Sequence, residues 1–107
     1  MSASSSLTLS RPLDMHLHLR DGEMLQLVAP ESAAQFAGAV IMPNLVPPVT
    51  SAVMLREYRE RIQAACGAPA LTFQPLMTLF FQHYTEAQLA EALPDLFAIK
   101  LYPHGVT

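Results

Sequence analysis

Short apolar segments alternate along this chain with segments of helical periodicity, and this alternation constrains the fold more than any other feature. The apolar segments, at 13–19, 39–42, 71–80 and 97–102, are rich in Leu, Ile, Val, Phe and Met. Helical segments are predicted between them. Parallel strands need a long crossover connection, which a helix usually supplies. The pattern therefore predicts βαβ units and the parallel sheet of an α/β protein.

Proline and glycine give the first boundaries. We expect Pro30 in the first turn of a helix that continues to Phe36 and ends before Gly38. Three prolines within 43–48 exclude helix and interior strand there, so this segment is predicted to be a loop. A short lead-in strand is expected at 7–9.

Capping residues and periodicity give the boundaries of the later helices and strands. A helix is predicted over 51–65, with Thr50 or Ser51 as its N-cap. Its apolar residues one turn apart form the stripe expected to be buried: Met54, Tyr58 and Ile62. Pro75 predicts a bulge or bend in the strand at 71–80. The segment 85–88, Thr-Glu-Ala-Gln, has the pattern of a capping box.

Composition limits the classes of function. Of the 107 residues, 51% are hydrophobic and only 14% are charged, which suits strands buried on both faces. The net charge of −3, with no basic patch, argues against nucleic acid binding. No apolar run is long enough for a membrane span. A single cysteine, Cys66, cannot form an internal disulfide, so we expect a cytoplasmic protein. Residues 1–6 are expected to be a flexible leader and 7–107 the folded part.

The run Asp-Met-His-Leu-His-Leu-Arg-Asp-Gly at 14–22 carries the clearest chemical signal. Residues i and i+2 of a strand share a face, so His16 and His18 are predicted to project side by side. Two neutral imidazoles held in this way can bind one metal ion. Spacing alone leaves this interpretation and that of two buried structural histidines as equal alternatives, because each buried ring needs a polar partner in either case.

Other polar residues stand where predicted strands end, and active sites of parallel α/β proteins collect at the carboxyl ends of strands. These residues are Arg20, Asn44, Thr78 and Lys100. Lys100 lies in an apolar segment, where it must pair, lose its proton, be modified, or lie exposed at an edge. Arg20 could instead pair with a nearby acid, and Asn44 could merely shape a turn. His104, in a Pro-His-Gly turn, is a weaker candidate.

Three segments together resemble the dihydroorotase family of the bacterial, single-function type, within the amidohydrolase superfamily. They are DMHLHLRDG at 14–22, MPNLVPPVT at 42–50 and KLYP at 100–103. The resemblance extends from about Leu9 to the last residue, in the family's order. It implies a (β/α)₈ TIM barrel, of which this chain would cover about the first four strands.

The resemblance also implies roles for individual residues. His16 and His18 would be metal ligands, and Lys100 would be carboxylated and bridge two Zn²⁺ ions in each subunit. Arg20 and Asn44 would bind the carboxylate of the substrate. The implied reaction is the reversible cyclisation of N-carbamoyl-L-aspartate to L-dihydroorotate in pyrimidine biosynthesis. A homodimer is one alternative for the oligomeric state.

The chain departs from the family in two respects. The family has two further histidine ligands and a metal-binding aspartate that acts as general acid and base, and these are expected beyond this sequence. The loop between Pro103 and His104 is also shorter than the family's. We therefore expect the chain to be inactive alone and to be part of a longer enzyme. Two alternatives stay open: an amidohydrolase for another cyclic amide such as a hydantoin, and an inactive homologue with a structural or binding role.

Overall fold

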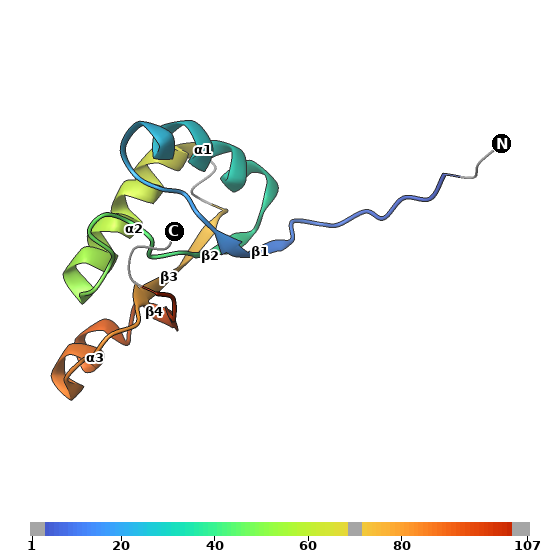
Figure 1. Cartoon of the computed structure of the whole chain (residues 1–107). Helices are drawn as coiled ribbons and strands as arrows, with labels where there is room; N and C mark the ends of the chain where they lie inside the picture. Colours follow the sequence, from blue (N-terminus) through green and yellow to red (C-terminus); the bar gives the residue numbers. More distant parts are fainter. Residues whose placement is uncertain (1–3, 69–71, 104–107) are drawn as a thin grey trace.

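The computed structural model describes residues 4–68 and 72–103 and contains a parallel sheet (Figure 1). Its four strands are β1 (Leu13–Leu17), β2 (Gly38–Ile41), β3 (Gln74–Phe80) and β4 (Leu96–Lys100). They lie side by side in chain order, and each neighbouring pair is parallel. The strands follow chain order, and a helix follows each of the first three. This is the arrangement of the first part of a (β/α)₈ barrel. The predicted α/β class and barrel architecture are confirmed.

Three helices connect the strands: α1 (Gly22–Gln35), α2 (Ala52–Cys66) and α3 (Glu86–Ala92). Ser51 caps α2 by accepting a hydrogen bond from the Met54 amide, which confirms one of the two expected caps. The capping box of α3 is also confirmed, because the Thr85 side chain and the Gln88 side chain each bond the other residue's backbone.

The start predicted for the first helix was wrong. Pro30 lies in the middle of α1, since the helix begins at Gly22, directly after the capping side chain of Asp21. A proline inside a helix removes one hydrogen bond and costs about 3 kcal/mol. The burial of Leu25 and Ala29 on the turns around it offsets that cost. Gly38 begins β2 instead of following the helix end.

Strand boundaries also differ from the prediction. Residues 7–9 form no strand and run extended in the long exposed segment that leads away from the sheet (Figure 1). Pro75 causes no shift of register between β2 and β3. Because the pairing of β3 with β4 begins only at Met77, the missing amide hydrogen of Pro75 leaves that ladder intact. The irregularity lies instead between Met77 and Thr78, toward β4.

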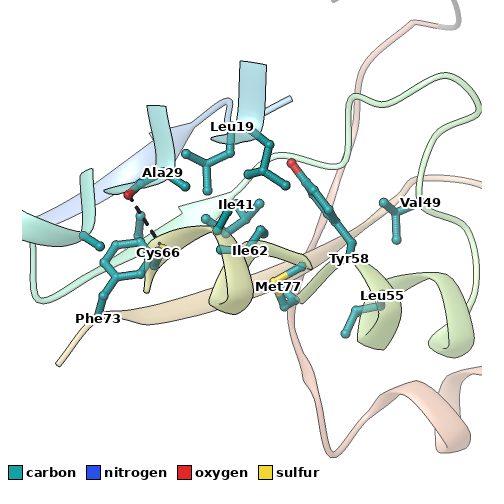
Figure 2. Close-up of a cluster of buried hydrophobic side chains, with 14 of the residues drawn as sticks. Leu19, Ala29, Ile41, Val49, Leu55, Tyr58, Ile62, Cys66, Phe73 and Met77 are labelled. Carbon is teal, nitrogen blue, oxygen red and sulfur yellow. Dashed lines mark hydrogen bonds between the residues drawn. The ribbon is translucent and has the colours of Figure 1, made fainter. Parts of the chain in front are cut away.

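One face of the sheet packs against α1 and α2 (Figures 1 and 2). Tyr58 and Ile62 of the predicted stripe are fully buried, whereas Met54 is only partly buried and Leu55 takes the interior place. Figure 2 shows Tyr58 and Ile62 beside Ile41 and Met77 of the sheet. The core therefore lies between the helices and the sheet.

The opposite face of the sheet is covered by no helix among the described residues (Figure 1). Strand register places Val40, Thr78 and Lys100 on this face. Large apolar side chains are exposed on both edge strands, including Met15 of β1 and Phe97 of β4, at 60% and 52%. Within the described residues no helix has the length and apolar character needed to cross a membrane.

Candidate functional site

The two histidines of the first strand converge. β1 ends at Leu17, so His16 belongs to the strand and His18 is the first residue after it. Their Nε2 atoms lie 3.0 Å apart, and their ring centroids are 5.0 Å apart with an interplanar angle of 47°. The predicted side-by-side placement of the two rings is therefore confirmed.

His18 is held in the form that binds metals. Burial lowers the pKa of its imidazole, and the positive charges of Lys100 and Arg20 lower it further. Its ring is therefore neutral near pH 7. The Nδ1 atom of His18 is buried and has no hydrogen-bond partner among the described residues. A buried nitrogen without a partner is costly, so this atom calls for a polar partner or a ligand.

Lys100 and Asn44 face each other across the sheet. The Lys100 Nζ atom donates a hydrogen bond of 2.8 Å to Asn44 Oδ1, which satisfies an asparagine only 5% exposed. The ammonium also lies 4.7 Å from the centroid of the Tyr102 ring, at cation–π distance. Burial lowers the pKa of Lys100, and the charge of Arg20 lowers it further. The lysine is paired, one of the alternatives that the sequence left open.

Arg20 stands in the turn between β1 and α1, with a backbone φ of 57°. Among the residues that the structure describes, its guanidinium has no hydrogen-bond or ion-pair partner. The alternative that Arg20 pairs with the acid beside it is wrong, because Asp21 pairs with Arg61. The positive charge of Arg20 acts on His18 and Lys100. This unpaired cation is suited to an anionic ligand.

Two of these groups, His16 and Lys100, line a hollow of about 340 Å³ on the uncovered face of the sheet. The side chains that line it come from all four strands and the loops after them: His16, Val40, Met42, Thr78, Ala98, Ile99, Lys100 and Leu101. No carboxylate lines it within the described residues. The hydroxyl of Thr78 donates to the Ile41 carbonyl, so Thr78 supports β2 and offers no free donor for catalysis.

The residues present fit part of a zinc site. A tetrahedral ion bound at about 2.0–2.1 Å places two ligand nitrogens about 3.3 Å apart, close to the separation of the two Nε2 atoms here. Within residues 4–68 and 72–103 no three His, Cys, Asp or Glu side chains form a metal-binding group. The histidine pair would therefore need further ligands. The Lys100 amine supplies a suitable one only when it is carboxylated.

The contribution of Tyr102 was missed in the sequence. Its ring packs edge-on against Phe80, with centroids 4.8 Å apart, and lies beside the Lys100 ammonium. The signal was present in the spacing, because Tyr102 follows Lys100 by two residues, as His18 follows His16. His104, the weaker candidate, lies outside the described residues, and His83 is exposed.

Comparison with known proteins identifies the family. A dihydroorotase from Ruegeria sp. (strain TM1040) is 50% identical over 107 residues, covering 97% of this chain and 31% of the relative. One from Idiomarina loihiensis is 52% identical over 105 residues, covering 95% and 30%. The chain belongs to the dihydroorotase family. It spans about 30% of the length of these dihydroorotases. No family model matches it.

Solved dihydroorotases share the fold. The crystal structure of dihydroorotase from Campylobacter jejuni superposes with a TM-score of 0.81 and 55% identity, over 91% of this chain and 28% of that one. Dihydroorotase from Saccharomyces cerevisiae, solved in complex with 5-fluoroorotic acid, gives a TM-score of 0.78 and 35% identity, covering 91% and 27%. The four-stranded sheet is therefore the first part of a dihydroorotase barrel.

Proposed function

We propose that this chain forms the first part of a zinc-dependent dihydroorotase, which interconverts N-carbamoyl-L-aspartate and L-dihydroorotate in pyrimidine biosynthesis. One observation carries the proposal: His16, which is paired with His18, and Lys100 line one hollow at the carboxyl ends of the strands, and the charge of Arg20, unpaired among the described residues, acts on His18 and Lys100. About 50% identity to curated dihydroorotases supports the choice of reaction. The single cysteine, buried and unpaired, supports a cytoplasmic setting.

His16, His18 and carboxylated Lys100 would hold the zinc ions, with Lys100 shared between two of them. When bound, zinc would polarise the amide carbonyl of the substrate and lower the pKa of water. The low pKa of His18 suits this role, because a ligand imidazole must be neutral. Carboxylation converts the costly half-buried ammonium of Lys100 into an anionic ligand.

Arg20 and Asn44 would orient the substrate. In ring closure, the terminal ureido nitrogen of N-carbamoyl-L-aspartate bonds to the side-chain carboxyl carbon and water leaves. The other carboxylate stays unchanged, so it can anchor the molecule throughout. A guanidinium binds a carboxylate through two parallel hydrogen bonds, and Arg20 has no competing partner among the described residues. Carboxylation would remove the charged ammonium donor that now binds Asn44, which would leave the asparagine side chain able to turn to the substrate.

The exposed edges support a larger barrel. Met15, Phe97 and Leu101 are 60%, 52% and 75% exposed, which is unusual for apolar side chains on or just after strands. Further strands would cover them and would bring the remaining ligands and the proton-transferring carboxylate that the hollow lacks. This explains why we expect the chain to be inactive by itself.

A chimera tests the proposal. This chain replaces the matching 28% of Campylobacter jejuni dihydroorotase, which completes the barrel around its residues. We expect zinc-dependent cyclisation of N-carbamoyl-L-aspartate, lost in His16→Asn. The exposed His83→Asn is the matched control and should retain activity.

Three results would count against the proposal. Hydrolysis of hydantoin in preference to L-dihydroorotate would change the substrate class. A folded chimera that binds zinc but converts neither compound would favour an inactive homologue with a binding role. Equal activity of His16→Asn and His83→Asn would remove the histidine pair from the metal site.

A further inference from the structure

Arg20 adopts a backbone conformation that non-glycine residues rarely take. Its φ of 57° lies in the left-handed region, where the side chain crowds its own carbonyl oxygen. Such a conformation persists only where the surroundings hold it, and it is common at functional sites. The turn that carries Arg20 follows Leu19, which is fully buried, and precedes the first residue of α1. The groups that hold this turn thereby set where the Arg20 guanidinium can reach.

Tyr58 of α2 binds the turn that carries Arg20. Its hydroxyl donates a hydrogen bond of 2.6 Å to the Arg20 carbonyl oxygen. Only 1% of Tyr58 is exposed, and Figure 2 shows its ring projecting from α2 with the oxygen on the side of Leu19. Burial raises the pKa of Tyr58, and the nearby Asp21 carboxylate raises it further, so the hydroxyl stays a donor at every pH of interest.

A second contact from α2 reaches the next residue of the same turn. The Arg61 guanidinium binds Asp21 through two bonds, Nε to Oδ1 at 3.0 Å and Nη2 to Oδ2 at 2.9 Å. Asp21 Oδ1 also accepts from the Gly22 amide as the N-cap of α1. The Arg61 guanidinium lies 5.4 Å from the Tyr58 ring centroid, so the two α2 residues support each other.

A purely structural role for Tyr58 explains its ring but leaves its hydroxyl unexplained. A phenylalanine would fill the same place between the helices and the sheet. The hydroxyl instead binds the carbonyl of Arg20, whose guanidinium has no partner among the described residues and whose charge acts on His18 and Lys100. The polar part of Tyr58 therefore acts on the geometry of Arg20.

We propose that Tyr58, supported by the Arg61–Asp21 pair, is a positioning residue that fixes the left-handed turn at Arg20 and thereby aims its guanidinium at the substrate carboxylate. This inference rests on the proposed function, which makes Arg20 a substrate-binding residue. Tyr58 itself does not touch the substrate. Its loss should weaken substrate binding more than it slows the chemical step.

The test uses Tyr58→Phe in the zinc-loaded chimera. We expect the KM for L-dihydroorotate to rise about threefold to tenfold, the range of one lost hydrogen bond, with kcat changed less than about twofold. Tyr84→Phe is the matched control, because the Tyr84 hydroxyl also donates to a backbone carbonyl, that of Phe80, at 2.5 Å. Arg61→Gln should raise KM in the same direction, through the same turn.

A double-mutant cycle separates positioning from general stability. In the Arg20→Ala background, Tyr58→Phe should leave KM unchanged, because no guanidinium remains to be aimed. An equal rise of KM in both backgrounds, or an equal rise in Tyr58→Phe and Tyr84→Phe, would overturn the positioning role. If Arg20→Ala alone leaves KM unchanged, the proposed role of Arg20 fails. If Arg20→Ala raises KM and Tyr58→Phe does not, only the positioning inference fails.

Discussion

The Lys100 Nζ atom lies 2.8 Å from Asn44 Oδ1, although the strands that lead to these residues are not neighbours. β3 separates β2 from β4, so their axes are about 9.6 Å apart, twice the spacing of adjacent strands. The long lysine side chain and the loop after β2 bridge that distance over the end of β3. This contact gives a buried amide oxygen a charged donor and holds the only lysine of the chain at the hollow.

Replacing Lys100 should abolish catalysis. In the chimera, both Lys100→Gln and Lys100→Arg are expected to lower kcat/KM by about a thousandfold, because neither residue can form a carbamate and the several kcal/mol supplied by the metal centre are lost. Lys100→Arg keeps the positive charge, so its loss of activity would show that the carbamate is needed and that a positive charge is not sufficient. Carbon-13 NMR after incubation with labelled bicarbonate should show a carbamate signal in the parent that is missing from both variants. Retained activity in Lys100→Arg would refute carboxylation.

Removing the partner of Lys100 should destabilise the metal-free protein. Asn44→Ala leaves the half-buried ammonium without its acceptor, and a hydrogen bond to a charged group contributes about 1.5–3 kcal/mol. Denaturant unfolding of the metal-free chimera measures the loss. The double variant Asn44→Ala, Lys100→Met removes both partners and should recover most of the free energy of unfolding. Equal losses in the single and double variants would show that the amide packs without depending on the lysine.

Much of the fold could be predicted because its signals are local. Apolar runs, caps at Ser51 and Thr85, and alternation with helices depend on neighbours in the sequence. The start of α1 was predicted wrongly from Pro30, because the effect of this proline depends on tertiary packing. The burial of one face of α1 outweighs the hydrogen bond that the helix lacks at Pro30. Sequence rules include the local cost of a proline in a helix, but they do not include the burial of the helix face against the core.

The site was predictable to the extent that strand geometry determined it. The spacing of His16 and His18 fixes a shared face, and the structure brings their rings together. The contacts of Asn44 and of Tyr58 were not predictable, since each joins residues from elements far apart in the chain. Tyr58 in particular fits a buried helical stripe, and only the position of its hydroxyl reveals a second role.

Gly38 and Gly22 should both resist substitution, for different reasons. A Cβ atom at Gly38 would lie 2.6 Å from the backbone oxygen of Gln74, so Gly38→Ala forces β2 and β3 apart. Overpacking of this kind costs about 1–3 kcal/mol or more. Gly22 has free space around it but a φ of 57°, so Gly22→Ala should cost about 1 kcal/mol. Thermal unfolding of both variants should show the larger loss at Gly38, and the reverse order would contradict the close approach of the two strands.

Acid should remove the contribution of Asp95 to the stability of the fold. Asp95 follows α3 and forms ion pairs with Arg56 and Arg59 of α2. The hydrogen bond from Arg59, at 2.8 Å, lowers the pKa of the Asp95 carboxyl, and Arg56 adds to this effect. A carboxyl whose pKa is lower in the folded than in the unfolded state stabilises the fold above its unfolded pKa, about 3.9, and loses that effect as pH falls through the folded value. Asp95→Asn should therefore lower the midpoint of thermal unfolding at pH 7, and the difference from the parent should shrink below pH ~4. Glu60→Gln, at an exposed position of α2, is the control, and its difference from the parent should not shrink in this way. A difference for Asp95→Asn that stays constant down to pH ~3 would mean that the charge of Asp95 has no part in it.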